Sequence, residues 1–131
     1  MTGSRVALDT NHAIHVLNDV PAIISWLNAF DHLCLPVTVV GELLYGAMNS
    51  GKSTENLARV SALVARCHVW ETTLRTSRTY AELRLDLKRR GRPVPENDLW
   101  IAAACVERDV ALASDDNHFA AMSGLKVLHG P

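Results

Sequence analysis

Short apolar runs along the chain alternate with longer stretches in which apolar residues recur every three or four positions. The short runs are bounded by polar residues or proline and have no room for a helical repeat, so they predict buried strands at 6–8, 33–35, 67–70, 111–113 and 125–128. The longer stretches predict helices at 13–17, 21–30, 38–46, 53–66, 73–90, 98–109 and 117–122. Strands that alternate with helices favour a parallel sheet. We therefore expect an α/β fold, a three-layer sandwich with a mostly parallel central sheet of about five short strands flanked by helices.

Capping residues and helix breakers set the expected ends of these helices. Pro21 fits the first turn of the second helix, and Thr38 and Asn97 are expected to cap the helices that follow them. Gly91 should close the long helix, since the segment 91–95 contains two prolines and cannot be helical.

The helix expected at 21–30 carries more apolar side chains than one contact with a core requires. Its apolar positions are Ile23, Ile24, Trp26, Leu27 and Phe30. A monomer would leave part of this surface in water, so the helix is a candidate docking surface for a partner. The alternative is that Trp26 packs against the neighbouring helix at 13–17.

Length, charge and cysteine usage add little that is specific. A chain of 131 residues, 48% of them hydrophobic, is long enough for one core, and we expect residues 1–131 to form a single domain. Thirteen Lys and Arg against 14 Asp and Glu neither favour nor exclude nucleic acid. Three cysteines without a C-x-x-C pair indicate reduced core thiols, and no apolar stretch reaches membrane-spanning length, so we expect no membrane contact.

Four acidic residues should meet at one edge of the predicted sheet. Asp9 and Asp116 follow strands, and ligands of open α/β sheets bind outside the carboxyl ends of the strands. The helix from Asp98 leads into the strand at 111–113 and must run antiparallel to it, which brings its first turn to the same edge. Glu42, one turn into the helix after the second strand, reaches that edge for the same reason.

Carboxylates gathered in this way repel one another unless a cation lies between them. Oxygen ligands without a His or Cys grouping suit Mg²⁺ or Mn²⁺ rather than zinc. Phosphodiester hydrolysis is the chemistry typical of such a site, because paired metal ions roughly 4 Å apart activate water and stabilise the leaving oxygen. Taken singly, each acid has another interpretation, as a helix cap or a solvated side chain; four acids at one edge favour the metal site.

The same residues carry a family resemblance. The motifs at 8–11 (LDTN), 42–46 (ELLYG), 98–103 (DLWIAA) and 114–119 (SDDNHF) resemble, in order and spacing, those of PIN-domain toxins of the VapC type. The resemblance spans nearly the whole chain. It implies a cytoplasmic Mg²⁺- or Mn²⁺-dependent endoribonuclease of a toxin–antitoxin pair, which acts on RNA, forms a homodimer and is inhibited by a small VapB-type antitoxin.

Carried over to this chain, the resemblance assigns Asp9, Glu42, Asp98 and Asp116 as the catalytic, metal-binding acids and Ser114 to the usual Ser or Thr position. Asp115 leaves the identity of the fourth acid open, although the spacing to Phe119 favours Asp116. Hydrogen bonds from Thr10 and Asn11 should orient the first acid, with helix entry as the alternative for Asn11.

Basic residues concentrate before Asp98, since seven of the 13 lie between positions 75 and 92. Arg90 and Arg92 are the candidates for binding RNA phosphates, and a solvated helix face is the alternative. His12 and His15 are expected on the surface or behind the acids, and His118 is a candidate contact to RNA.

Two other functions fit parts of the pattern. A PIN-like module that binds RNA or protein without cleaving is the main alternative, although it would more readily lack one of the acids. A phosphoryl-transfer domain shares the parallel sheet and an aspartate after the first strand. It fits poorly, because Asn11 replaces the second aspartate that a dehalogenase-type phosphatase needs.

Overall fold

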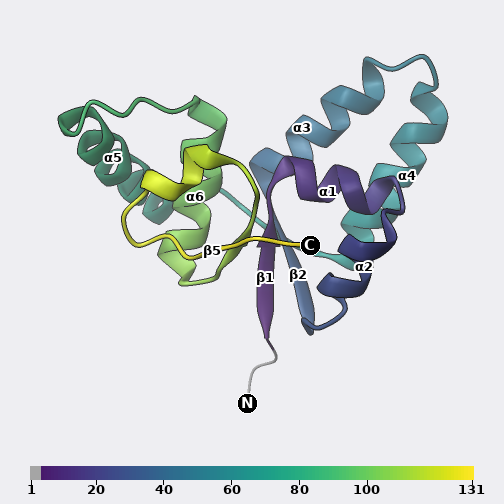
Figure 1. Ribbon diagram of the computed structural model, residues 1–131. Helices are drawn as coiled ribbons and strands as arrows, with labels where there is room; N and C mark the ends of the chain where they lie inside the picture. Colours follow the sequence, from purple (N-terminus) through teal and green to yellow (C-terminus); the bar gives the residue numbers. More distant parts are fainter. Residues whose placement is uncertain (1–3) are drawn as a thin grey trace.

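The computed structural model describes residues 4–131, which form a five-stranded sheet with helices on both sides (Figure 1). The strands are β1 (Arg5–Leu8), β2 (His32–Pro36), β3 (His68–Trp70), β4 (Leu112–Ala113) and β5 (Val127–Leu128). Their order is β3-β2-β1-β4-β5, and every neighbouring pair is parallel. The predicted α/β sandwich with a mostly parallel sheet of about five strands is confirmed.

In residues 4–131, six α-helices and one 3-10 helix surround this sheet. In chain order they are α1 (Thr10–Leu17), α2 (Pro21–Leu27), α3 (Val37–Met48), α4 (Ser53–Arg66), α5 (Leu74–Arg89), α6 (Glu96–Arg108) and η1 (Asn117–Ala121). Figure 1 shows α1 to α4 grouped on one side of β1 and β2, and α5 and α6 on the other.

Two of the four expected helix ends are confirmed: α2 begins at Pro21, and Gly91, whose φ is +67°, ends α5. At its other end α5 is capped by Thr73, which forms a reciprocal capping box with Thr76. The expected caps Thr38 and Asn97 are wrong, because α3 and α6 begin earlier, directly after Pro36 and Pro95. Both prolines hold extended backbone before the first helical residue, a conformation that prepares a helix start without a side-chain cap.

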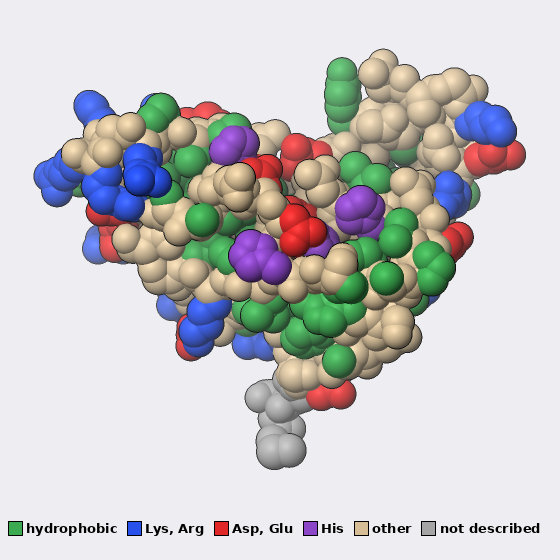
Figure 2. All heavy atoms as spheres, viewed as in Figure 1, with side chains coloured by type: hydrophobic (Ala, Val, Ile, Leu, Met, Phe, Trp, Pro, Cys, Tyr) green, Lys and Arg blue, Asp and Glu red, His purple; other side chains and the backbone are tan. Residues whose placement is uncertain are grey.

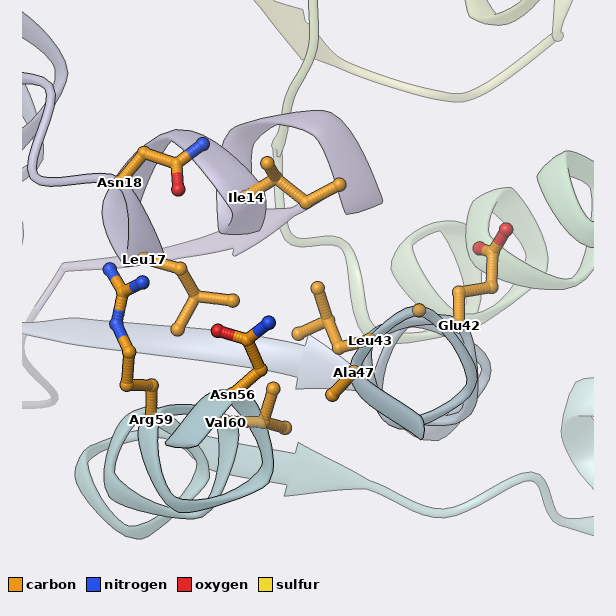
Figure 3. A pocket seen from close by; sticks show the side chains of 10 residues that line it. Ile14, Leu17, Asn18, Glu42, Leu43, Ala47, Asn56, Arg59 and Val60 are labelled. Carbon is orange, nitrogen blue, oxygen red and sulfur yellow. The ribbon is translucent and has the colours of Figure 1, made fainter. Parts of the chain in front are cut away.

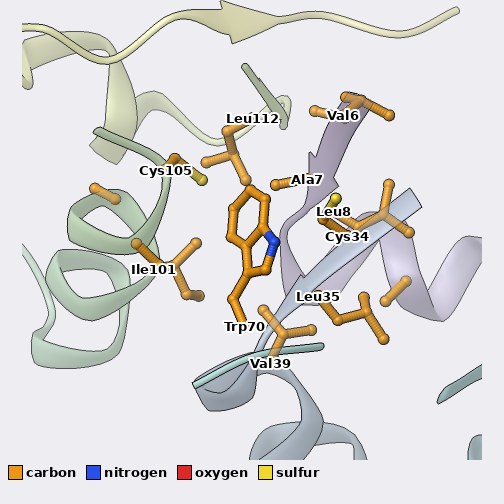
Figure 4. Close-up of a cluster of buried hydrophobic side chains, with 14 of the residues drawn as sticks. Val6, Ala7, Leu8, Cys34, Leu35, Val39, Trp70, Ile101, Cys105 and Leu112 are labelled. Carbon is orange, nitrogen blue, oxygen red and sulfur yellow. The ribbon is translucent and has the colours of Figure 1, made fainter. Parts of the chain in front are cut away.

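The core lies between the sheet and both groups of helices. Trp70, at the end of β3, points between α6 and β1, where its ring lies among Ile101, Cys105 and Leu112 (Figure 4). Ala7 and Leu8 of β1 are fully buried, as expected for a central strand covered on both faces. Packing in the core therefore fixes the carboxyl ends of β1 and β4, and so fixes the positions of the residues that directly follow these strands.

For Trp26 on α2 the structure favours the alternative, packing against α1, while Ile24 is half-buried and stays a candidate for contact with a partner. Ile23 and Leu27 are buried, while half-buried Trp26 packs against the core and contacts Phe30 and the His12 ring of α1. The large hydrophobic side chains exposed in residues 4–131 lie elsewhere, on α1, α3 and α5: Ile14, Tyr45, Met48, Leu74 and Leu85. Most of the apolar surface expected on α2 is therefore covered by the core and by α1.

The cysteines match the expected reduced core thiols, since all three are free, with Cys34 and Cys105 buried and Cys67 half-buried. Burial raises the pKa of each of the three thiols, which keeps them protonated. Among residues 4–131, no helix is both long and apolar enough to cross a membrane.

Candidate metal centre

The strand order reverses at β1, because β2 and β3 lie to one side of it and β4 and β5 to the other. The crevice at the carboxyl ends of β1 and β4 is therefore the place where open α/β sheets bind ligands. Asp9 follows β1 and Ser114 follows β4, and the Ser114 hydroxyl donates to Asp9 Oδ2 over 2.5 Å.

Asp9 is 4% exposed, and hydrogen bonds to both of its carboxylate oxygens hold the side chain in place. Its Oδ1 accepts from the backbone N–H of His12 at 2.8 Å, which caps α1, and lies 3.1 Å from His12 Nδ1. Burial alone would raise the pKa of this carboxyl, but the hydrogen bonds from His12 and Ser114 outweigh it and lower the pKa. Asp9 is thus both the helix cap and an ionised, oriented carboxylate.

Glu42 lies on α3 and reaches the same edge. Thr10 Oγ1 donates to its Oε1 at 2.6 Å, and Asn97 Nδ2 donates to its Oε2 at 3.3 Å. Thr10 therefore orients the second acid, whereas it was expected to orient Asp9. Asn97, which was expected to cap a helix, instead ties α6 to α3.

Asp98, Asp116 and His118 form the tightest group of possible ligands. One ligand atom from each lies within 4.8 Å of the others. His118 Nδ1 is 2.8 Å from Asp98 Oδ2 and 3.1 Å from Asp116 Oδ1, so the imidazole lies between the two carboxylates. The first turn of α6 and the residues after β4 thus meet where the topology predicts.

The pKa of Asp98 is raised. Partial burial is the largest cause, and the negative charges of Asp116 and Glu42 add to it, although the hydrogen bond with His118 opposes them. Repulsion among Glu42, Asp98 and Asp116 is the electrostatic signature of a site that a divalent cation would neutralise, so the donor set fits Mg²⁺ or Mn²⁺.

The adjacent acids Asp115 and Asp116 point to different neighbours. Asp116 accepts from the backbone N–H of His118 and caps η1, and its own N–H donates to Ser114 Oγ at 3.0 Å. Asp115 is exposed, with its two oxygens 4.0 Å from His12 Nε2 and 3.7 Å from His129 Nδ1. Asp116 is therefore the acid that adjoins Asp98.

The two arginines expected to bind RNA lie in different surroundings. Arg90 forms an ion pair with Asp86 at 2.6 Å and donates to the carbonyl oxygen of Ala121, whereas exposed Arg92 has no ion pair within residues 4–131. Asn11 is exposed on α1 and lines a cavity with His12 and Asp116.

Sequence reasoning missed the part that histidine plays, since it expected the acids to stand without a His grouping. His118 bonds both Asp98 and Asp116, and His12 is buried against Asp9, which is the second of its two expected placements, behind the acids. The sequence carried a signal for both residues, since each His lies two or three positions after an acid that caps a helix.

Figure 2 shows acidic and His side chains gathered in the hollow between the two groups of helices, with many Lys and Arg at one end of the molecule.

Comparisons with known proteins agree with this geometry. A family model described as the PIN domain matches residues 6–125. The chain is 30% identical to Ribonuclease VapC1 of Haemophilus influenzae over 109 residues, which cover 80% of this chain and 81% of the relative.

Solved structures show the same fold. The chain matches a DNA-bound VapBC structure from Salmonella typhimurium with a TM-score of 0.91 and 26% identity, over 96% of this chain and 98% of the other. It matches VapBC-5 of Mycobacterium tuberculosis, a member of the VapBC family of toxin–antitoxin systems, with a TM-score of 0.74 and 26% identity, over 96% and 97%. The chain therefore belongs to the PIN domain family, as a relative of the VapC ribonucleases.

Proposed function

We propose that this protein is the toxin of a toxin–antitoxin pair and acts as a Mg²⁺- or Mn²⁺-dependent endoribonuclease. The observation that carries the proposal is the meeting of Glu42, Asp98 and Asp116, whose charges repel one another, beside an ionised Asp9. The VapC relatives that share the fold are named ribonucleases, which supports RNA as the substrate.

The four acids Asp9, Glu42, Asp98 and Asp116 would hold the metal. When bound there, a divalent ion supplies a Lewis acid that polarises the phosphodiester and favours ionisation of the attacking water. This is the role for which hard oxygen ligands are suited.

Other residues keep these acids in position. Ser114 and the His12 backbone fix Asp9, and Thr10 and Asn97 fix Glu42. His118 Nδ1 lies between Asp98 Oδ2 and Asp116 Oδ1. We propose that the His118 side chain, which is 47% exposed, turns outward when a cation binds and then donates to RNA. Asp115 adjoins these acids but faces the other way.

RNA would approach from the side of α5 and α6. Arg92 lines a surface cavity near the start of α6 with Lys88 and with Arg84, which is ion-paired with Glu96 of the same lining. Cations attract phosphates, and Arg92 is free to bind one because, unlike Arg84, it has no ion pair in residues 4–131. Arg90 supports the same surface through Asp86 and Ala121.

A groove on the other side of the acids suits the antitoxin. It lies between α1, α3 and α4 (Figure 3) and is lined by apolar side chains with polar ones at its rim, namely Ile14, Leu17, Leu43, Ala47, Val60, Asn18, Asn56, Arg59 and Glu42. An amphipathic VapB-type segment could bury its apolar face here while a basic side chain reaches Glu42. The homodimer that the resemblance implies stays a prediction, which light scattering of the purified chain would test.

The decisive experiment compares RNA cleavage by the parental protein, Asp98→Asn and the matched control Asp19→Asn. Asp19 is an exposed aspartate at the opposite end of α1 with φ of +53°, a backbone that Asn also adopts. Loss of Mg²⁺-dependent cleavage in Asp98→Asn alone supports the proposal. Parental activity in a folded Asp98→Asn protein would contradict it, and binding of RNA without cleavage by the parental chain would favour the non-cleaving PIN-like module.

A further inference from the structure

The cavity that Arg92 and Lys88 line, here called the α5 hollow, lies between the end of α5 and the segment 91–95 that leads into α6. Its volume is about 310 Å³, at the small end of the roughly 300–1,000 Å³ typical of ligand pockets. A hollow of this size suits one planar ring system rather than a folded segment of a partner.

The lining of the α5 hollow is apolar at its floor and cationic at its rim. Leu87 and Leu99 are buried and Val94 is half-buried, whereas Lys88 and Arg92 are exposed. Neither of these two cations has an ion pair within residues 4–131. Figure 2 shows Lys and Arg side chains gathered at this end of the molecule. Apolar contact beside free cations matches a nucleotide, whose base has apolar faces and whose phosphate is negative.

A network of polar and aromatic side chains holds one wall of the α5 hollow. Arg84 Nη1 donates to Glu96 Oε1 and to the hydroxyl oxygen of Tyr80, each at 2.7 Å. The Tyr80 ring stacks on Trp100 of α6, with ring centroids 3.9 Å apart and an angle of 8° between the planes. These contacts hold α5 against α6, so the hollow is formed before any ligand binds. Because Arg84 and Glu96 compensate each other, the wall adds little net charge.

The first turn of α6 joins the α5 hollow to the acids. Glu96 lines the hollow, and the next residue, Asn97, donates to Glu42. Asp98, which follows, belongs to the group of acids. Among residues 4–131, no side chain caps α6 after Pro95, so the N–H groups of its first turn stay available to a phosphate. One RNA strand that crosses this helix end can therefore reach both the hollow and the acids.

We propose that the α5 hollow binds one unpaired base of the RNA, while Lys88 and Arg92 bind the neighbouring phosphates. This inference rests on the proposed function, since it names the part of the substrate that this side of the site takes. A base within a duplex is covered by its stacked neighbours and its pairing partner, so only an unpaired base can enter. Binding then has two separable parts, apolar contact with the base and ionic contact with the phosphates.

A second hollow, here called the α4 hollow, offers a matched control. Its volume is about 200 Å³, and it has Leu17 and Leu63 beside the cations Arg59 and Arg66. Its chemistry is thus similar, but it lies toward the end of α1 that is remote from Asp9. A strand held at the acids reaches the α5 hollow and not the α4 hollow, so the effective concentration of the base is higher in the first.

The test compares two ligands that carry the same charge. One is a single-stranded oligouridylate, and the other is a ribose–phosphate chain of the same length without bases. The affinity of each labelled ligand is measured by fluorescence anisotropy with Mg²⁺ present, in Asp98→Asn protein, which should not cleave. The difference between the two affinities reports the contact with the base alone.

We expect the oligouridylate to bind at least about 5-fold more tightly than the chain without bases, because the α5 hollow buries a base. Val94→Phe, which fills this hollow, should remove most of the difference and leave the affinity for the chain without bases unchanged. Arg92→Ala should weaken the binding of both ligands. Ala62→Phe, which fills the α4 hollow, should change neither affinity.

Photocrosslinking keeps the inference testable if Val94→Phe does not fold. An oligouridylate that contains 4-thiouridine should crosslink to peptides within residues 84–99. Equal affinities for the two ligands, an unchanged preference in folded Val94→Phe, or crosslinks confined to α1 or α4 would each overturn the inference. Cleavage of RNA by the parental chain together with any of these results would leave the proposed function standing. A preference for bases that Val94→Phe removes, in a parental chain that does not cleave, would instead contradict the nuclease and keep the base site.

Discussion

The two halves of the acid site are prepared in opposite ways. On the sheet side, Asp9 is buried, bonded by Ser114 and His12, and has a lowered pKa. On the helix side, Asp98 and Asp116 are partly exposed, share one imidazole nitrogen, and Asp98 has a raised pKa. One half is satisfied without a cation, and the other is not.

This difference follows from the part that each acid plays in the fold. Asp9 caps α1 at the end of the central strand, so local structure uses its charge and stabilises it. Asp98, in the first turn of α6, also faces a favourable helix dipole, but the charges of Glu42 and Asp116 oppose it. On the sheet side, local structure therefore stabilises the charge of Asp9. On the helix side, the acids repel one another, and metal binding would relieve this repulsion.

The largest expected effect is on catalysis, where the two halves should be equally necessary. Asp9→Asn and Asp116→Asn should each lower the rate of Mg²⁺-dependent RNA cleavage by at least about 100-fold, since each removes a charge that stabilises the transition state through the metal. Asp115→Asn, the matched neighbour, should keep the parental rate with Mg²⁺. A large loss in Asp115→Asn with parental activity in Asp116→Asn would reverse the assignment of the fourth acid.

Without metal, substitutions in the two halves should change the free energy of unfolding in opposite directions. Asp9→Asn should lower the free energy of unfolding by about 1–3 kcal/mol, because charge-assisted hydrogen bonds from Ser114 and His12 are lost in a buried place. Asp98→Asn should raise it, because repulsion from Glu42 and Asp116 is removed. Urea denaturation with EDTA present measures both, and a destabilised Asp98→Asn protein would contradict the stored repulsion.

Sequence patterns predicted the sheet, most helices and the edge where the acids meet, because these depend on short apolar runs and strand order. They did not predict the pairings, since Thr10 reaches Glu42 and Asn97 links α6 to α3 across long separations in the chain. A place behind the acids was one of the two expected for His12, but its contacts with Asp115 and Gly130 were not predicted, because these residues come from distant segments. Periodicity tells which face a residue occupies and not which side chain arrives opposite it.

Metal binding should act on the same repulsion. Mn²⁺ at about 100 times its dissociation constant should stabilise the parental chain by about 2.7 kcal/mol, because the ion binds only the folded state. The shift should be much smaller in Asp98→Asn, which starts more stable and lacks one ligand. Thermal unfolding with and without Mn²⁺ measures this, and equal shifts in the two proteins would place the ion away from Asp98.

The pH dependence of stability should also differ between the halves in metal-free protein. The lowered pKa of Asp9 means that its contribution is present above its ordinary pKa and is lost as pH falls through the folded value. The raised pKa of Asp98 has the reverse effect, so its contribution is present at low pH and is lost as pH rises through the folded value. The advantage of Asp98→Asn over the parental chain should therefore grow as pH rises above 3.8, and an advantage that shrinks would contradict the raised pKa.

The smallest expected effect concerns the side of the acids from which RNA approaches. Arg92 lies on the helix side near the start of α6, and Arg59 lines the groove on the other side with Glu42; neither has an ion pair in residues 4–131. If RNA follows the helix side, Arg92→Ala should reduce the slope of log affinity against log salt by about 0.7, while Arg59→Ala leaves it unchanged. Arg90→Ala should change the slope less than Arg92→Ala, because its charge is already paired with Asp86. Binding measured with Asp98→Asn protein, which should not cleave, gives these slopes directly. A reduced slope in Arg59→Ala alone would instead move the RNA path to the α1–α3–α4 groove, where substrate and antitoxin would then compete for the same surface.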